Sequence, residues 1–93
     1  MKKAGLRKIN KNIRYTLDKL VEVTWADSSS RSGWDRAGVY ADSAQPLECR
    51  TAGYLFRRTE YEICIVQNVT EHGHVDMMMT IPFTCVRSIR NLN

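Results

Sequence analysis

The run Tyr61–Val69 (YEICIVQNV) constrains the fold of this chain more than any other segment. Ile63 and Ile65 are apolar, and so are Cys64 and Val66 at the alternate positions. Because successive side chains of a strand point to opposite faces, this pattern predicts a strand that is buried on both sides or lies centrally in a sheet. The fold is therefore expected to be built on a β-sheet.

Four further segments have the pattern of short strands. In the clearest, residues 20–27, Val21, Val23 and Trp25 share one face and alternate with more polar residues. The other three are predicted at 49–58, with a bend or bulge at Gly53, at 75–81 and at 86–92. The expected turns are RRTE at 57–60, TEHGH at 70–74 with Gly73, and Pro82 followed by a 3₁₀ turn over 83–86. Five short strands separated by turns predict a mainly β fold that closes into a small barrel.

A long insertion separates the first two predicted strands. The serine-rich run SSSRS at 28–32 is followed by Gly33 and Trp34. Ser32 is predicted to cap a short helix over 33–42, with Asp35 in its acidic first turn.

Residues 1–19 form a basic segment ahead of the first strand. They contain seven basic residues and one acidic residue, whereas the rest of the chain has seven arginines and nine acidic residues. The apolar residues Leu6, Ile9, Ile13 and Leu17 of this segment are spaced three and four apart, which predicts a helix that ends near Tyr15. The segment is either a solubilising tail or an arm that contacts nucleic-acid phosphates. The predicted contacts are Lys2, Lys3, Arg7, Lys8, Lys11 and Arg14. The predicted organisation is a basic N-terminal helix or arm at 1–19 and a small β-barrel domain at 20–93.

Length and cysteine usage favour a small protein of a reducing compartment. A chain of 93 residues has a marginal core, so we expect homo-oligomerisation to add to it. The cysteines Cys49, Cys64 and Cys85 are odd in number, and Cys64 lies within an apolar run, which favours free thiols and a cytoplasmic protein. No membrane-spanning or signal segment is predicted.

No motif for catalysis or metal binding is present in the sequence. The spacings match neither a nucleophile elbow, nor a zincin helix, nor a phosphate loop, and we expect no enzyme and no cofactor. His72 and His74 are two residues apart in a hairpin, but zinc needs further ligands, so no metal site is predicted. Among Met77, Met78 and Met79, two are expected in the core and Met78 at a subunit contact or on the outer face.

Aromatic, basic and acidic side chains near the insertion suggest a ligand site. An aromatic face, guanidinium groups and a carboxylate suit a nucleobase, a phosphate and a base or ribose edge. The candidate ligand-binding residues are Trp34, Asp27, Tyr54, Arg57, Arg58 and Arg31. Trp25 is expected in the core beneath them. The alternative is a contact between the two tryptophans that folds the insertion down, with Arg57 and Arg58 as solvated turn residues.

Two resemblances follow from these patterns. The strand VEVTW at 21–25 and the stretch VDMMMTIPFTCVRSI at 75–89 resemble the first strand and the last hairpin of SH3-like and Sm-like small barrels. The resemblance implies five bent strands with a tight corner before the last. The long insertion replaces the short turn of the Sm-like pattern, so no RNA-binding residue is carried over.

Residues 20–92 also resemble small uncharacterised proteins of tailed phages and prophages. The residues that carry this likeness are Val21, Val23, Trp25, Asp27, Ser28, Trp34, Gly53, Tyr54, Leu55, Ile81, Pro82, Val86, Ile89 and Leu92. The resemblance implies a phage-borne accessory protein in the host cytoplasm.

The sequence leads to two functional hypotheses. In the first, the protein is a non-catalytic phage-type accessory protein. It would bind a nucleotide-type ligand, either a small nucleotide signal or a single-stranded nucleic acid, and counteract host defence. In the second, it is an interaction or structural module that docks a host or virion protein through an exposed edge or the basic helix.

Overall fold

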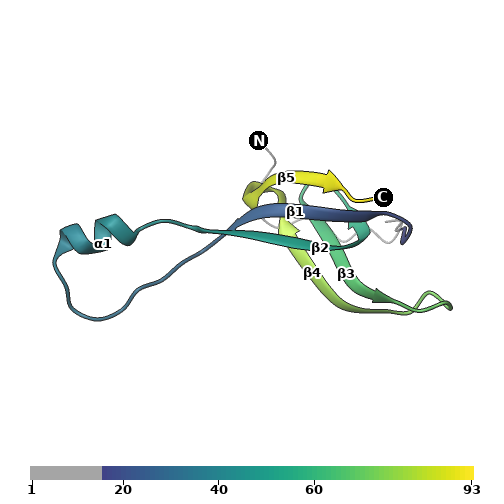
Figure 1. Cartoon of the computed structure of the whole chain (residues 1–93), viewed down its shortest axis with the longest axis horizontal. Helices are drawn as coiled ribbons and strands as arrows, with labels where there is room; N and C mark the ends of the chain where they lie inside the picture. Colours follow the sequence, from purple (N-terminus) through teal and green to yellow (C-terminus); the bar gives the residue numbers. More distant parts are fainter. Residues whose placement is uncertain (1–15) are drawn as a thin grey trace.

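A computed structural model describes residues 16–93 as a five-stranded antiparallel sheet with one short α-helix (Figure 1). The elements are β1 (Leu20–Asp27), α1 (Ala37–Ser43), β2 (Leu47–Arg58), β3 (Glu62–Val69), β4 (Val75–Pro82), the 3₁₀ helix η1 (Phe83–Cys85) and β5 (Val86–Asn91). The five predicted strands and the 3₁₀ turn are thereby confirmed. The helix predicted to end near Tyr15 lies outside the described residues.

The sheet is open, which corrects the prediction of a closed barrel. The strand order is β4-β3-β2-β1-β5, so β4 and β5 lie at opposite edges and do not pair. After Pro82, the single turn η1 directs the chain to the free edge of β1, where Val23 pairs with Ile89. Each outer strand therefore pairs with one neighbour only, and the mainly β class holds without closure.

The core lies on one face of the sheet where β1, β3 and β4 contribute alternate residues. Its fully buried members are Val21, Val23, Ile63, Ile65 and Ile81. Cys64 and Val66 are buried as well, so the prediction that this run is buried on both sides is confirmed. Trp25 packs against the core and is half-buried, as its strand face predicted.

Two irregularities bend the ladders. The register shifts between Thr24 and Trp25 in the β1–β5 ladder and between Leu55 and Arg57 in the β2–β3 ladder. Such shifts increase local twist and bend a strand. Gly53, expected at a bend or bulge, lies two residues before the second irregularity. It permits β2 to approach β3, since an added Cβ would lie 2.5 Å from Ile65 Cγ2.

Residues 28–46, hereafter the arm, project from the sheet (Figure 1). Asp27 pairs with Leu47, although pairing of β1 with β5 has already ended at Trp25. The arm is therefore attached to a two-stranded ribbon, and the molecule is elongated, with extents of 55 × 28 × 22 Å. No residue of α1 is buried.

The short helix begins later than predicted. Gly33 has a φ of +99°, which no helical residue adopts, and Arg36 at the N-cap is extended with φ −69° and ψ 145°. Ser32 is therefore not the cap, and no side chain caps α1. Asp35 pairs with Arg31 instead of occupying the first helical turn.

The expectation that two methionines fill the core is wrong. Met77, Met78 and Met79 are 65%, 59% and 41% exposed. The physical reason is that β4 is an edge strand that buries only Ile81, while Met77 has a φ of +61° and interrupts the regular alternation of side chains.

We predict that Gly53→Ala lowers the free energy of unfolding by about 1–3 kcal/mol, because its methyl group overpacks the β2–β3 contact. Urea denaturation followed by circular dichroism measures this change. Gly38→Ala is the matched control, since an added Cβ there meets nothing within 4 Å and alanine favours the helix. Equal stability of Gly53→Ala and the wild type would contradict the close approach.

Candidate functional site

The predicted ligand-binding residues fall into two separate groups. Asp27 lies at the end of β1, and Arg31 and Trp34 lie in the arm. Tyr54, Arg57 and Arg58 lie toward the other end of β2; this strand begins opposite Asp27 at Leu47. Leu47 and Arg58 are eleven residues apart, which spans about 36 Å of extended strand. The structure does not bring the six residues into one pocket.

The group on the sheet makes contacts within the fold. Arg57 is 22% exposed, and its Nη2 atom lies 3.9 Å from Oε2 of Glu62. The Arg58 Cζ atom lies 5.1 Å from the centroid of the Phe83 ring, in the geometry of a cation–π contact. Tyr54 is half-buried in β2, opposite Leu20 of β1 and Val66 of β3. These contacts connect β2 with its neighbours.

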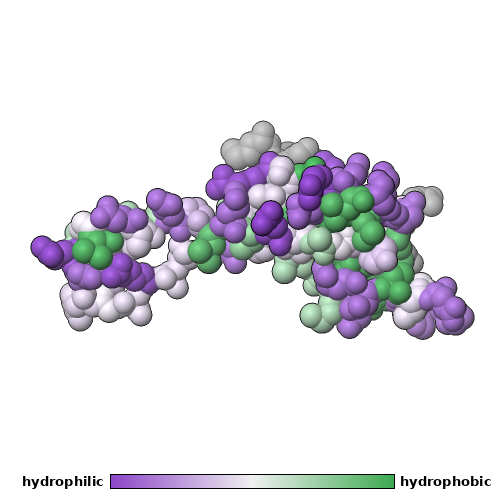
Figure 2. Space-filling model, in the orientation of Figure 1, coloured by the Kyte–Doolittle hydropathy of each residue, from purple (hydrophilic) through white to green (hydrophobic). Residues whose placement is uncertain are grey.

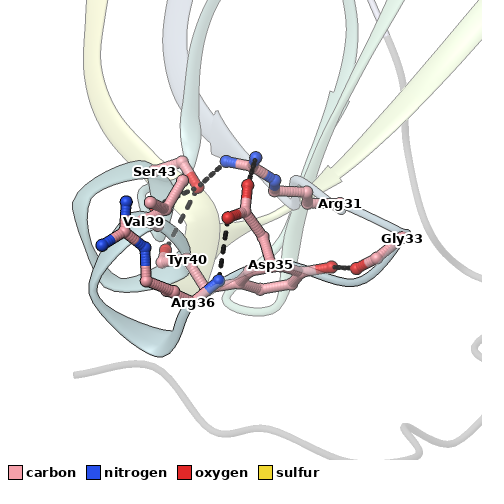
Figure 3. Close-up of polar contacts among 7 residues, drawn as sticks. All are labelled: Arg31, Gly33, Asp35, Arg36, Val39, Tyr40 and Ser43. Carbon is pink, nitrogen blue, oxygen red and sulfur yellow. Dashed lines mark hydrogen bonds and ion pairs between the residues drawn. The ribbon is translucent and has the colours of Figure 1, made fainter.

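Arg31 is the centre of a polar network in the arm (Figure 3). Its Nη2 donates to Oδ2 of Asp35 at 2.9 Å, and its Nη1 donates to Oγ of Ser43 at 3.3 Å. Its Cζ atom lies 5.0 Å from the centroid of the Tyr40 ring. One side chain thus connects the loop before α1 with both turns of the helix.

Further hydrogen bonds fix the loop to the helix and to the start of β2. The Tyr40 hydroxyl donates to the carbonyl of Gly33, and Figure 3 shows this contact beside the Arg31 network. Ser29 Oγ donates to the carbonyl of Gln45 at 2.6 Å. Because a helix of seven residues is unstable alone, we attribute the order of the arm to these polar contacts.

The arm is hollowed on two sides. A pocket of about 390 Å³ lies between the serine loop and the end of α1; it is lined by Ser29, Ser30, Arg31, Tyr40, Ser43, Ala44, Gln45 and Leu47. A second, shallower hollow of about 430 Å³ is lined by Gly33, Trp34, Asp35, Ala37 and Tyr40.

Trp34 is the most exposed large apolar side chain of the described residues, at 104% of its reference area. The positive φ of Gly33 reverses the chain directly before it, and Tyr40 holds the Gly33 carbonyl. The alternative, a contact with Trp25, is absent from residues 16–93, because Trp25 packs on the core and its Nε1 donates to Thr51 Oγ1 at 3.0 Å. Trp34 is therefore presented to solvent at a fixed turn.

Within residues 16–93, no group of three or more histidine, cysteine, aspartate or glutamate side chains is placed to hold a metal ion. Cys49, Cys64 and Cys85 are free thiols. The predicted nucleic-acid contacts Lys2, Lys3, Arg7, Lys8, Lys11 and Arg14 lie outside the described residues.

Tyr40 and Ser43 belong to the arm network but were not predicted from the sequence. The one signal of this network in the sequence is the spacing of Arg31 and Asp35, because opposite charges four residues apart can form an ion pair. Nothing in the local sequence indicates that Tyr40 lies under Arg31, because that contact depends on the chain reversal at Gly33.

Comparison with known proteins gave no match to a protein-family model, a curated protein or a solved structure. In the described part of the chain, the one α-helix is too short and too polar to cross a membrane.

We predict that Arg31→Ala increases amide exchange in α1 about fivefold, because the lost ion pair and cation–π contact together stabilise the arm by about 1 kcal/mol. Hydrogen exchange read by NMR would compare α1 with β3. Arg50→Ala, at an exposed arginine on β2 outside the arm, is the control. Unchanged exchange in α1, or a matching change in β3, would show that the network does not order the arm.

Proposed function

We propose that the protein is a non-catalytic binding module that docks on a protein partner through the arm, with Trp34 as the anchor. The observation that carries this proposal is the complete exposure of Trp34 on a projecting, ordered segment. Figure 2 shows the arm projecting from the rest of the molecule, whose visible surface carries both hydrophilic and hydrophobic residues.

Burial of Trp34 would supply the energy of such a contact. A tryptophan buries on the order of 150–250 Å² of surface, and tryptophan, tyrosine and arginine dominate the binding energy of protein interfaces. The arm places all three types together, at Trp34, Tyr40 and Arg31. Because the polar network already orders the loop, docking loses less conformational entropy than folding a free loop would.

Because of where the arginines lie, a nucleotide-type ligand is the second candidate, after a protein partner. Arg57 and Arg58 are too far from Trp34 to hold the phosphate of a base that stacks on it. The Arg31 guanidinium is already paired with Asp35, and a phosphate would have to displace that carboxylate. The geometry therefore favours an apolar protein surface over a phosphorylated ligand.

One observation favours the nucleotide alternative. The 390 Å³ pocket combines the hydroxyls of Ser29, Ser30 and Ser43 with Arg31 and the ring of Tyr40. A small nucleotide signal could donate and accept hydrogen bonds there, while a single-stranded nucleic acid would use the basic residues of 1–19 as well. Saturable binding of a cyclic dinucleotide or oligo(dT), lost in Arg31→Ala, would establish this alternative; a steep fall with salt would identify the nucleic acid.

The proposal includes a relation of the fold to SH3-like barrels and a phage-type origin of the protein. The strand order and the corner at Pro82–Cys85 are the features that support relating this open sheet to SH3-like barrels. The pattern of residues 20–92 supports a phage-type accessory protein in the host cytoplasm. A host or virion protein would then be the class of partner, and interference with host defence the process served.

The test places a photo-cross-linking aromatic amino acid at position 34 in cells that express the full chain. We expect a discrete adduct to a protein, because the side chain would lie inside the interface. After identification and purification of that protein, Trp34→Ala should weaken its binding by about 2 kcal/mol, roughly thirtyfold in Kd.

The same cross-linker at Arg87 is the control, since Arg87 is exposed on β5, outside the arm. Adducts of equal yield from both positions, adducts to nucleic acid alone, or no adduct at all would overturn the proposal.

A further inference from the structure

Large apolar side chains are exposed at several places on the described chain, and two of these places lie far apart. One is Trp34 at the arm; the other is a set on β4 that we call the methionine strip, composed of Val75, Met77, Met78 and Met79. We propose that Trp34 of one copy docks on the methionine strip of a second copy. This inference rests on the proposed function and adds a second copy of the chain as a partner of the arm.

The methionine strip is an accessible surface along an edge strand. β4 pairs only with β3, and its register runs from Glu62–Pro82 to Val69–Val75. Its outer edge faces no other strand of the described chain. A long apolar edge strand is a ready site for association with another chain.

The backbone at Met77 enlarges the strip. A φ of +61° is uncommon for a residue other than glycine and marks a strained backbone. Regular alternation would direct Met78 to one face and its two neighbours to the other. With Met77 in this conformation, all three methionines are exposed. The strained residue thus lies within the methionine strip.

Trp34 cannot contact the methionine strip of its own chain. The arm and the β3–β4 hairpin lie toward opposite ends of a molecule whose longest extent is 55 Å (Figure 1). The arm is held in place by the ladder from Leu20–Tyr54 to Asp27–Leu47, so it does not fold back onto β4. A contact between Trp34 and the methionines therefore requires a second copy.

The chemistry of the two surfaces is complementary. Thioether sulfur makes favourable contacts with aromatic rings, and unbranched methionine adapts to the shape of a large ring. Arg36 is adjacent in sequence to the exposed turn, and Asp76 lies within the strip; both are exposed, and neither forms an ion pair with another described residue. Docking would bring this positive charge near this negative charge, which fixes the orientation of the contact.

The contact is head-to-tail, because the donating and accepting surfaces differ. Such contacts produce a closed ring or an open chain of subunits. A single tryptophan buries far less than the roughly 1,200 Å² of a stable interface, so α1 and the flanks of β4 have to contribute area. Assembly is accordingly expected to depend on protein concentration.

The experiment measures the mass of the purified full chain by sedimentation velocity over a range of concentrations. The wild type should exceed the 10.7 kDa of one chain. Arg36→Glu and Asp76→Arg should each weaken assembly about tenfold, and the double reversal should restore it. Arg87→Glu, at an exposed arginine on β5, is the control and should have no effect.

Two further variants separate loss of contact from loss of folding. Trp34→Ala removes an exposed side chain and should give monomers with an unchanged circular dichroism spectrum. Met77→Gly is compatible with the positive φ, so it should also remain folded while assembling less.

A wild type that stays at the mass of one chain would overturn the inference, and so would an oligomer unaffected by Arg36→Glu, Asp76→Arg and Trp34→Ala. A monomer that still forms a cross-link from position 34 to another protein would overturn this inference alone and leave the proposed function standing.

Discussion

The ladder between β1 and β2 determines both the core and the exposed arm. Its paired residues run without interruption from Leu20–Tyr54 to Asp27–Leu47. At one end, it holds Val21 and Val23 against the isoleucines of β3 and β4. At the other end, it continues beyond the neighbouring strands and carries residues 28–46 away from the sheet. The same ladder thus positions core residues at one end and holds the exposed arm at the other.

The sheet and the arm are therefore stabilised by different kinds of interaction. The sheet is stabilised by apolar burial around Ile63 and Ile65, which are inaccessible to solvent. The arm has no buried residue in its helix and is ordered by an ion pair, a cation–π contact and hydrogen bonds around Arg31. Exposed polar contacts of this kind are individually weak, so the arm is the part expected to open first and to adapt to a partner.

Much of the fold could be predicted because period-two patterns are local. The strand at 20–27, the buried run Ile63–Val66 and the end of β4 at Pro82 follow from alternation and from the missing donor of proline. Closure could not be predicted, because it depends on whether two distant edges meet. The candidate site was predicted only in part: Trp34 and Arg31 share the arm, but Arg57 and Arg58 lie far from it because they are the last two residues of the twelve-residue strand β2.

The sequence by itself determined which segments are extended, which faces are apolar and where turns occur, since these depend on side chains a few residues apart. The alternation of residues 21–25 already predicted that Trp25 packs on the core, whereas only the tertiary structure decided that Trp34, nine residues later, points to solvent. The physical reason is that exposure depends on what lies opposite a side chain. β1 packs with β3 and β4 in the core, whereas the turn at Gly33 is held by Tyr40 of α1 within the arm, away from the core.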